Sequence, residues 1–323
     1  MKRFKNILFV ADFETQCSDA FARAVALAEH NQAVLTVVAI MAEAPVGYQQ
    51  KINGFSLADL STPVREKLQQ QLDDLAASAK KNITIKTHIL TGKTFLALIQ
   101  EVITEKMDLL IKTVTEEKFM DRFLGSSDMH LLRKCPCPVW LIKSSQQGQY
   151  KRILAAVDFD VFAPKKEDNT LNQQLMGLSL SLALSEFSEL HIVHVWHAYG
   201  ESSLRSGFNQ QPKASVDAYV EETKMKHQQQ LDELVSTFIN KAGQETADYI
   251  KPKLHLLKGN AVDKIPELVK EQDIDLIMMG TVGRTGLSGF FMGNTSETIL
   301  NSIDCSVLAV KPEGFISPVS SEE

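Results

Sequence analysis

Short apolar runs alternate with longer amphipathic segments along most of the chain. Each run has the length of a strand, and the segments between them place apolar residues at helical spacing, as at Leu68, Leu72 and Leu75. Strands are predicted at residues 7–11, 34–40, 83–90, 107–113, 138–143, 153–157, 190–196, 253–257, 276–279 and 306–311. Helices are predicted at residues 18–31, 63–80, 93–105, 127–134, 171–187, 216–241, 262–271 and 295–301. This alternation predicts parallel sheets with helices on both faces.

The second half of the chain repeats the first. The matching stretches are residues 7–13 with 153–159, and residues 137–143 with 305–311. The polar stretch 144–149 lacks a periodic apolar pattern and is interpreted as a linker. We therefore predict two domains, at residues 1–144 and 150–312, which suits a chain of 323 residues.

A glycine-rich segment follows the ninth predicted strand. It begins at Gly280, contains Gly283 and ends at Gly293, after which Asn294 opens a predicted helix. Glycines let the main chain approach an anion closely, and the free N–H groups and dipole of a helix start favour negative charge. Ligands of parallel sheets bind beyond the carboxyl ends of the strands, where Asp158 also lies. The pattern predicts a phosphate site at this edge.

These residues resemble the universal stress protein family, whose ATP-binding members carry Gly-x2-Gly-x9-Gly-Ser/Thr. The spacing of Gly280, Gly283 and Gly293 fits that motif, and Asn294 stands at its final position. The resemblance covers nearly the whole chain, twice. It implies an α/β fold of two tandem, doubly wound domains, each with a five-stranded parallel sheet of the adenine-nucleotide alpha hydrolase type.

The resemblance also implies a nucleotide site in domain 2, with ATP as the expected ligand. The family's aspartate against base and sugar corresponds to Asp158, and its apolar adenine contact to Val195. The expected site residues are Asp158, Val195, Gly280, Gly283, Gly293, Asn294 and Thr295. The amide of Asn294 can donate the hydrogen bond of the missing hydroxyl, but its carbonyl oxygen repels phosphate. Binding and loss of binding therefore both stay open.

Domain 1 keeps Asp12 but has lost loop glycines. Lys112 and Thr115 are interpreted as standing where domain 2 has its first two loop glycines, and only Gly125 and Ser126 remain. Their side chains occupy space that phosphate would need. We predict that domain 1 binds no ATP.

Composition and charge limit the classes of partner. A net charge of −6 gives no electrostatic footprint for nucleic acid. Four cysteines in a chain this long form no disulfide framework, which indicates a reducing compartment. We expect a cytoplasmic protein, because there is no signal-peptide pattern and no apolar run near the roughly 20 residues of a membrane span. The resemblance implies that the two last strands pair within the chain as an internal pseudo-dimer, and a further homodimer is compatible with it.

Several conspicuous residues have ordinary explanations. His191, His194 and His197 share one predicted strand, but His194 faces the other side of the sheet and the outer two lie about 20 Å apart, so no single metal ion joins all three. Cys135 and Cys137 lack partners for a zinc site. Cys137 and Cys305 occupy the same position in the two repeats and are expected to be small buried hydrophobes. Cys17 is the cysteine to test for reactivity.

Other positions keep alternatives. Asp158 could order a turn, and Arg284 could be solvated rather than bound to phosphate. Residues 290–292 are expected in the core or an interface, or alternatively in an apolar ligand pocket. The enlarged segments 161–169 and 198–212 are interpreted as rims or lids of the site, or as variable surface loops.

No catalytic motif accompanies the loop. The sequence has no Gly-x4-Gly-Lys-Ser/Thr phosphate loop, no Gly-x-Ser-x-Gly elbow and no His-x-Gly-His. A regulatory protein that binds a small molecule is therefore favoured over an enzyme. Three hypotheses remain: a nucleotide-binding protein that the resemblance links to survival under stress such as DNA damage, the same scaffold with an apolar or lipid-like ligand, and a weak ATPase or phosphotransferase.

Overall fold

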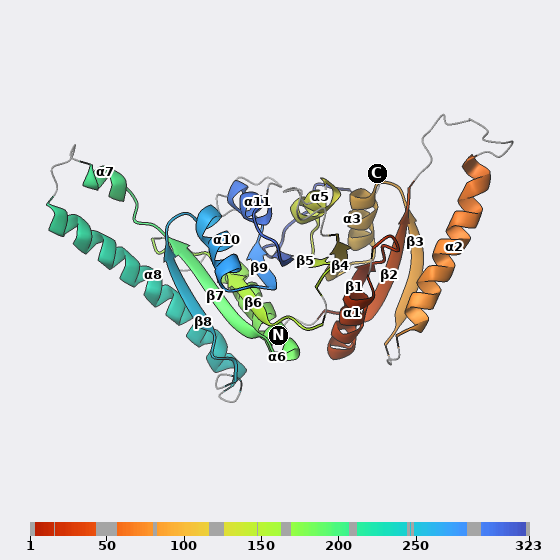
Figure 1. The fold of residues 1–323 in the computed structure, drawn as a ribbon, viewed down its shortest axis with the longest axis horizontal. Helices are drawn as coiled ribbons and strands as arrows, with labels where there is room; N and C mark the ends of the chain where they lie inside the picture. The colour runs from red at the N-terminus through yellow and green to blue at the C-terminus, as the bar shows by residue number, and fades with distance from the viewer. Residues whose placement is uncertain are drawn as a thin grey trace. The chain divides into compact units, whose positions relative to one another are not determined.

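A computed structural model describes most of the chain (Figure 1). The described residues are 4–15, 17–42, 57–79, 83–115, 126–146, 148–162, 169–206, 212–243, 246, 249–282 and 292–320. They form two compact units. Unit 1 comprises Met1–Gly148, Thr281–Met292 and Ser306–Glu323, and unit 2 comprises Gln149–Gly280 and Gly293–Cys305.

Unit 1 contains a sheet in the order β3-β2-β1-β4-β5-β10. Its strands are β1 (Asn6–Val10), β2 (Val34–Met41), β3 (Ile85–Thr91), β4 (Leu109–Val114), β5 (Val139–Lys143) and β10 (Ser306–Val310). Its helices are α1 (Ser18–Asn31), α2 (Leu57–Ala77), α3 (Thr94–Thr104) and α5 (Ser126–Lys134). Strands β1 to β5 are parallel, and α2 packs along β3 and β2 (Figure 1).

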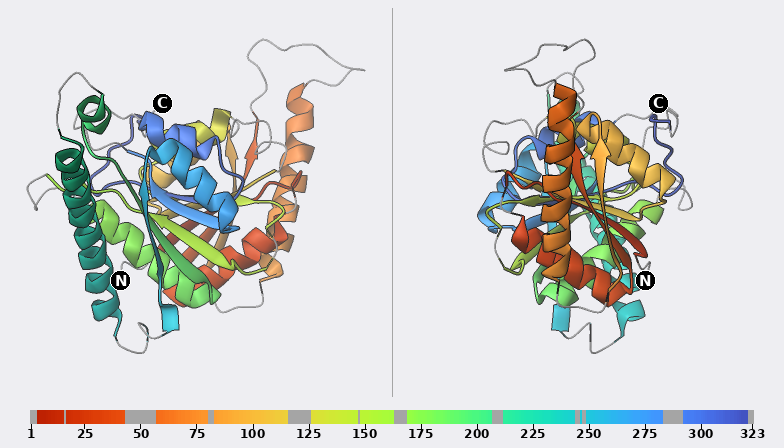
Figure 2. Two further views of the ribbon diagram at one scale, coloured as in Figure 1. Left: turned by 60° about the vertical axis from the view of Figure 1, so that its left-hand side comes forward. Right: turned by 90° about the vertical axis from the view of Figure 1, so that its right-hand side faces the viewer.

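Unit 2 contains parallel strands in the order β9-β6-β7-β8. These strands are β6 (Arg152–Ala156), β7 (Glu189–Trp196), β8 (Lys253–Lys258) and β9 (Leu276–Gly280). Its helices are α6 (Asn169–Glu186), α7 (Glu201–Arg205), α8 (Lys213–Ala242), α10 (Ala261–Glu271) and α11 (Asn294–Leu300). Helices α6 and α8 pack on one face of β7 and α10 on the other (Figure 2). The doubly wound α/β fold predicted from the sequence is thereby confirmed.

The last strands of the two repeats pair with each other. Strand β10 runs antiparallel to β5, with Leu308 opposite Trp140 and Ala309 opposite Val139. Burial of these strands, with Trp140 only 1% exposed, explains their nearly continuous apolar sequence. The predicted pairing of last strands within one chain is confirmed. The C-terminal strand of the second repeat consequently belongs to unit 1, whereas the predicted domain boundaries follow the sequence repeat and stay a prediction.

Two elements differ from the sequence prediction. Helix α2 begins at Leu57, not at Pro63, which lies inside the helix. Proline favours a helix start, but a helix can extend past it at the cost of one backbone hydrogen bond, and residues such as Leu57 favour helix. The segment after β7 was expected to be loop, but it forms the short helix α7, with Gly200 before it at φ +72°.

Candidate functional site

Those predicted site residues of domain 2 that the structure describes lie around one edge of the unit 2 sheet. Because the strands are parallel, the end of β6 and the end of β9 at Gly280 meet there, and Asp158 follows β6. Val195 lies on β7 beside Leu257 of β8 and is half-buried. Gly283 lies outside the described residues. The roles of these residues as ligands stay a prediction.

A buried asparagine holds the chain at Asp158. The Asn172 Nδ2 donates to the Asp158 carbonyl at 2.7 Å, and the Asp158 N–H donates to Asn172 Oδ1 at 3.2 Å. Asn172 is 3% exposed, whereas Asp158 is exposed. The Asn172 amide thus fixes the main chain at Asp158, just after β6 ends. Sequence reasoning missed Asn172, because the neighbouring Gln173 and Gln174 are also amides and nothing in the sequence set this one apart.

Gly280 serves close packing at the end of β9. A Cβ atom built there would lie 2.6 Å from the Leu171 Cδ2 of α6, well inside van der Waals contact. The glycine therefore admits Leu171, in addition to any role toward phosphate. The Gly280 carbonyl also accepts a hydrogen bond from the Ser296 hydroxyl at 3.1 Å, which ties the first turn of α11 to the end of β9. Ser296 is a further residue that the motif alone did not single out.

The start of α11 is organised by glycine. Gly293 is the N-cap, with extended φ −65° and ψ 138°, and no side chain caps the helix. Asn294 and Thr295 occupy the first two helical positions and are exposed. Asn294 is therefore the first residue of the helix and not its N-cap. Its exposed side chain stands at the position where the family motif has Ser or Thr.

The strand register corrects the alignment of the first repeat. Ile7 pairs with Leu109 in unit 1, and its counterpart Ile153 pairs with Leu276 in unit 2. Counting forward, Lys112 corresponds to Met279 and not to Gly280, so the sequence assignment was wrong by one residue. The sequence does carry a marker for this single step, because Asp108-Leu109 and Asp275-Leu276 precede the two strands at the corrected offset. The counterpart of Gly280 is Thr113, and the counterpart of Gly283 is the residue after Thr115.

Matching aspartates support this register. The Asp108 carboxylate accepts from the N–H groups of Lys5 and Asn6, at 2.7 and 3.0 Å. In unit 2 the Asp275 carboxylate accepts from the N–H groups of Lys151 and Arg152, at 2.6 and 2.8 Å. Each aspartate immediately precedes its strand, so the two repeats align there without a gap.

A buried ion pair occupies the corresponding place in unit 1. The Nζ of Lys112, within β4, lies 2.9 Å from Asp128 Oδ1 in the first turn of α5, with side-chain exposures of 8% and 2%. The same positions in unit 2 hold Met279 and Ser296. Domain 1 thus places its own carboxylate near the start of α5, and a lysine neutralises it.

The histidines of β7 form two separate pairs. On one face His191 Nδ1 is 3.0 Å from His255 Nε2, and its Nε2 is 2.9 Å from the Glu189 carboxylate. On the other face His194 Nε2 is 2.8 Å from His227 Nδ1 on α8. No group of three or more His, Cys, Asp or Glu side chains suited to a metal occurs among the described residues.

An aromatic ring stacks on the second histidine pair. Phe159, which follows Asp158, stacks on His194 with ring centroids 3.8 Å apart and an interplanar angle of 20°. The His227 ring also lies 5.7 Å from Trp196. Phe159, the residue after Asp158, is therefore held in place by stacking on His194, a contact that the sequence motif did not reveal.

Acidification is expected to destabilise the protein through the first histidine pair. Burial lowers the pKa of both His191 and His255 below the ordinary 6.5. Their contribution to the free energy of unfolding is therefore present above pH 6.5 and lost as pH falls through the lower folded pKa. His88 opposes this trend, because its hydrogen bond to the Glu101 carboxylate raises its pKa. Urea unfolding at pH 7 and pH 5 should show a smaller loss in His255→Gln than in the wild type, and an equal loss would contradict the assignment.

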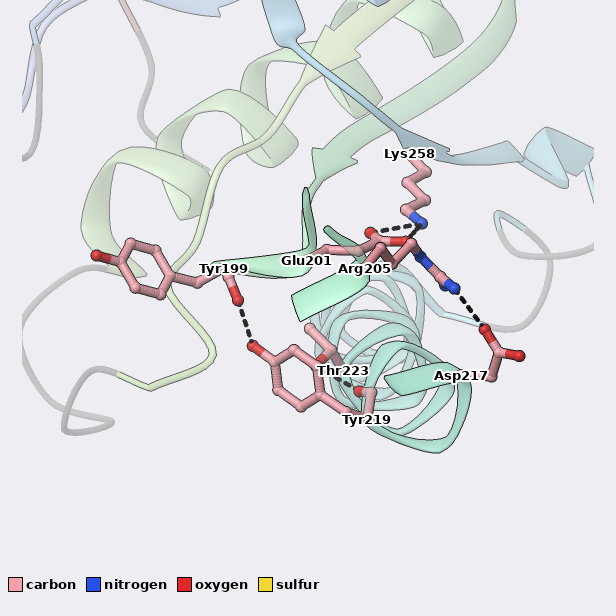
Figure 3. A network of polar contacts seen from close by, with 7 residues as sticks. All are labelled: Tyr199, Glu201, Arg205, Asp217, Tyr219, Thr223 and Lys258. Carbon is pink, nitrogen blue, oxygen red and sulfur yellow. Dashed lines mark hydrogen bonds and ion pairs between the residues drawn. The ribbon is translucent and has the colours of Figure 1, made fainter. Parts of the chain in front are cut away.

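The described part of the enlarged segment after β7 is fastened to its neighbours (Figure 3). The network contains Tyr199, Glu201, Arg205, Asp217, Tyr219, Thr223 and Lys258. The Glu201 carboxylate pairs with Lys258 of β8 at 2.7 Å and with Arg205 at 2.9 Å, and Arg205 also pairs with Asp217 of α8 at 2.8 Å. The described part of this segment therefore lies against the end of β8 and the start of α8. A role as a rim or lid of the site stays a prediction, with a variable surface loop as the alternative.

The remaining candidates lie in the interior or outside the described residues. The four cysteines are buried and unbridged, and burial raises the pKa of the Cys17 thiol, which argues against its reactivity. Met292 is 5% exposed and packs in the interior of unit 1, whereas Arg284, Phe290 and Phe291 lie outside the described residues. No described helix is long and apolar enough to cross a membrane.

Comparison with known proteins gives one consistent family. The universal stress protein family matches residues 3–143 and again residues 149–311. The chain is 29% identical to a universal stress protein E homolog of Haemophilus influenzae, with 96% of this chain and 98% of the relative covered. It is 30% identical to universal stress protein E of Escherichia coli K12, over 72% of this chain and 69% of the relative.

Solved structures share the fold over the same length. A putative universal stress protein from Pseudomonas aeruginosa aligns with a TM-score of 0.63 at 23% identity, over 96% of this chain and 94% of the other. A universal stress protein from Archaeoglobus fulgidus aligns with a TM-score of 0.59 at 16% identity, over 96% of this chain and 98% of the other. With its two matched segments, the chain belongs to the universal stress protein family.

Proposed function

We propose that this chain is a stress-response binding protein whose second repeat binds an adenine nucleotide, ATP in the first instance, and whose first repeat does not. The observation that carries the proposal is the contrast between the two repeats. Unit 2 keeps Gly280 and Gly293 at the edge of its sheet and exposes Asp158, Asn294 and Thr295 there. Unit 1 has the buried ion pair of Lys112 and Asp128 beside this place, where unit 2 has Met279 and Ser296.

The ligand set follows from position and chemistry. Asp158 would accept hydrogen bonds from the ribose, and Val195 would contact the base. The loop from Gly280 through Gly283 to Gly293 would offer main-chain N–H groups to phosphate, with Asn294 and Thr295 as further donors.

Titration of the full chain with ATP tests this function. We expect one nucleotide per chain, and a loss of affinity of about tenfold or more in Gly283→Val, equivalent to about 1.4 kcal/mol or more. Gly177→Val is the matched control, because a Cβ at Gly177 meets no atom within 4 Å. Unchanged affinity in Gly283→Val would refute the loop assignment, and two nucleotides per chain would refute the inactive first repeat.

Two other outcomes would favour the alternatives. A lipid-like mass retained in native mass spectrometry of freshly purified protein would favour an apolar ligand. Turnover of ATP above a blank, abolished by Gly283→Val, would favour a weak ATPase or phosphotransferase. We propose a non-catalytic regulatory role in the cytoplasm, in survival under stress such as DNA damage, and the shared name of the relatives supports the stress role. A further homodimer is compatible with this role.

A further inference from the structure

A buried lysine lies beside the stem of the glycine loop, by which we mean Thr281 and Val282 where the chain leaves the sheet and Met292 where it returns. Lys311 follows β10 and is 4% exposed, and Thr281, the residue after Gly280, is fully buried. The Lys311 Nζ donates to the Thr281 hydroxyl oxygen and to the Leu132 carbonyl. The Thr281 hydroxyl in turn donates to the Leu132 carbonyl at 3.4 Å. One ammonium group therefore holds the threonine side chain at the entrance of the loop.

The main chain of the stem is fixed as well. The Thr281 N–H donates to the Val310 carbonyl at 3.3 Å, directly before Lys311. Val282 and Met292 form an isolated antiparallel bridge, so the chain leaves and returns at neighbouring points. The two ends of the stem are thus bridged to each other, and Lys311 contacts the stem at its first residue, Thr281.

A buried ammonium has a high free-energy cost, which suggests that this contact has a purpose beyond packing. Burial lowers the pKa of Lys311 to about 8, so the group is mostly charged at neutral pH. Its charge faces the Phe315 ring at 5.1 Å, and the Cys135 thiol is the titratable group whose charge acts on it. The oxygens of Thr281 and Leu132 compensate for part of its lost hydration.

The first repeat lacks the same anchor. By strand register the counterpart of Thr281 is Val114, which carries no hydroxyl, and the counterpart of Lys311 is the half-buried Lys143. The repeat that has threonine in place of Gly280 has therefore also lost the side chain that the lysine would hold. The second repeat therefore has both Gly280 and the hydrogen bond from Lys311 to Thr281, and the first repeat has neither the glycine nor the threonine at the equivalent positions.

We propose that Lys311 is a positioning residue that fixes the stem of the glycine loop through Thr281 and thereby sets the affinity of the loop for the nucleotide phosphates. This role rests on the proposed nucleotide binding, although its effect on the stem is independent of any ligand. Lys311 acts through Thr281, the residue after Gly280, whose N–H also bonds to the Val310 carbonyl.

The test compares three variants of the full chain. Lys311→Met removes the charge, Thr281→Val removes the hydroxyl with little change in volume, and Lys143→Met is the matched control in the first repeat. Hydrogen–deuterium exchange is followed at residues 276–282 and 292–300, without ligand, and ATP affinity is measured separately. If Lys311→Met fails to fold, Thr281→Val carries the test.

Lys311→Met and Thr281→Val are expected to speed exchange at Thr281 and Val282 and to weaken ATP binding on the order of tenfold, since a loosely supported site loses affinity. Lys143→Met should change neither. ATP affinity of the wild type should fall from pH 7 to pH 9 as Lys311 loses its proton, and Lys311→Met should lack this dependence.

The outcomes separate the two proposals. Exchange as slow in Lys311→Met as in the wild type would overturn the positioning role. Faster exchange with unchanged ATP affinity would overturn its link to the nucleotide. A wild-type chain that binds no ATP would overturn the proposed function, whereas faster exchange in Lys311→Met would still support the anchoring of the stem.

Discussion

Replacing Lys112 with methionine is expected to lower the free energy of unfolding by about 3–5 kcal/mol. The substitution leaves the Asp128 carboxylate without its partner, although its side chain is only 2% exposed. A buried charge without compensation costs far more than the ion pair itself contributes. Urea unfolding of the two proteins measures the difference.

The second repeat supplies the compensating variant. Met279 and Ser296 stand where unit 1 has Lys112 and Asp128, so Lys112→Met combined with Asp128→Ser should recover most of the loss. As a control, Lys224→Met removes the exposed pair with Glu221, which has side-chain exposures of 50% and 60%, and should cost less than about 1 kcal/mol. A double variant as unstable as the single one would show that the ion pair is not the cause.

Introducing a charge into β10 is expected to disrupt unit 1. Ala309 is 2% exposed and lies opposite Val139 of β5, so Ala309→Glu would bury a carboxylate with no partner and cost about 3 kcal/mol or more. The raised pKa of this new carboxyl should make the loss smaller at low pH, because protonation removes the charge. Urea unfolding at pH 7 and pH 5 measures both effects.

Exposure of β5 gives a second measurement of the same change. If β10 detaches, the β5 edge with Val139 and Leu141 can pair with other chains, and size-exclusion chromatography should show larger species. Ile316→Glu is the control, because Ile316 is 73% exposed and the same side chain there should change stability by less than about 0.5 kcal/mol. Equal effects of the two substitutions would contradict the role of β10.

The sequence by itself determined the repeat, the α/β class and the sheet edge at which the proposed site is placed. These features depend on local patterns: apolar runs of strand length, helical spacing between them, and glycines at the end of a run, as at Gly280. Such patterns can be recognised in the sequence without knowing which distant residues are in contact. The pairing of last strands was also accessible, because the resemblance implied it.

Only the tertiary structure decided which side chains meet. The register of β4 against β1 changed the alignment of Lys112 with the second repeat by one position. The packing of α5 on β4 brought Asp128 next to Lys112 as its partner. Asn172 holds Asp158, 14 residues before it, and Lys311 holds Thr281, 30 residues before it, and both contacts depend on how separate elements pack. Periodicity specifies which face of an element is buried, but the partner of each buried polar group depends on how the elements pack.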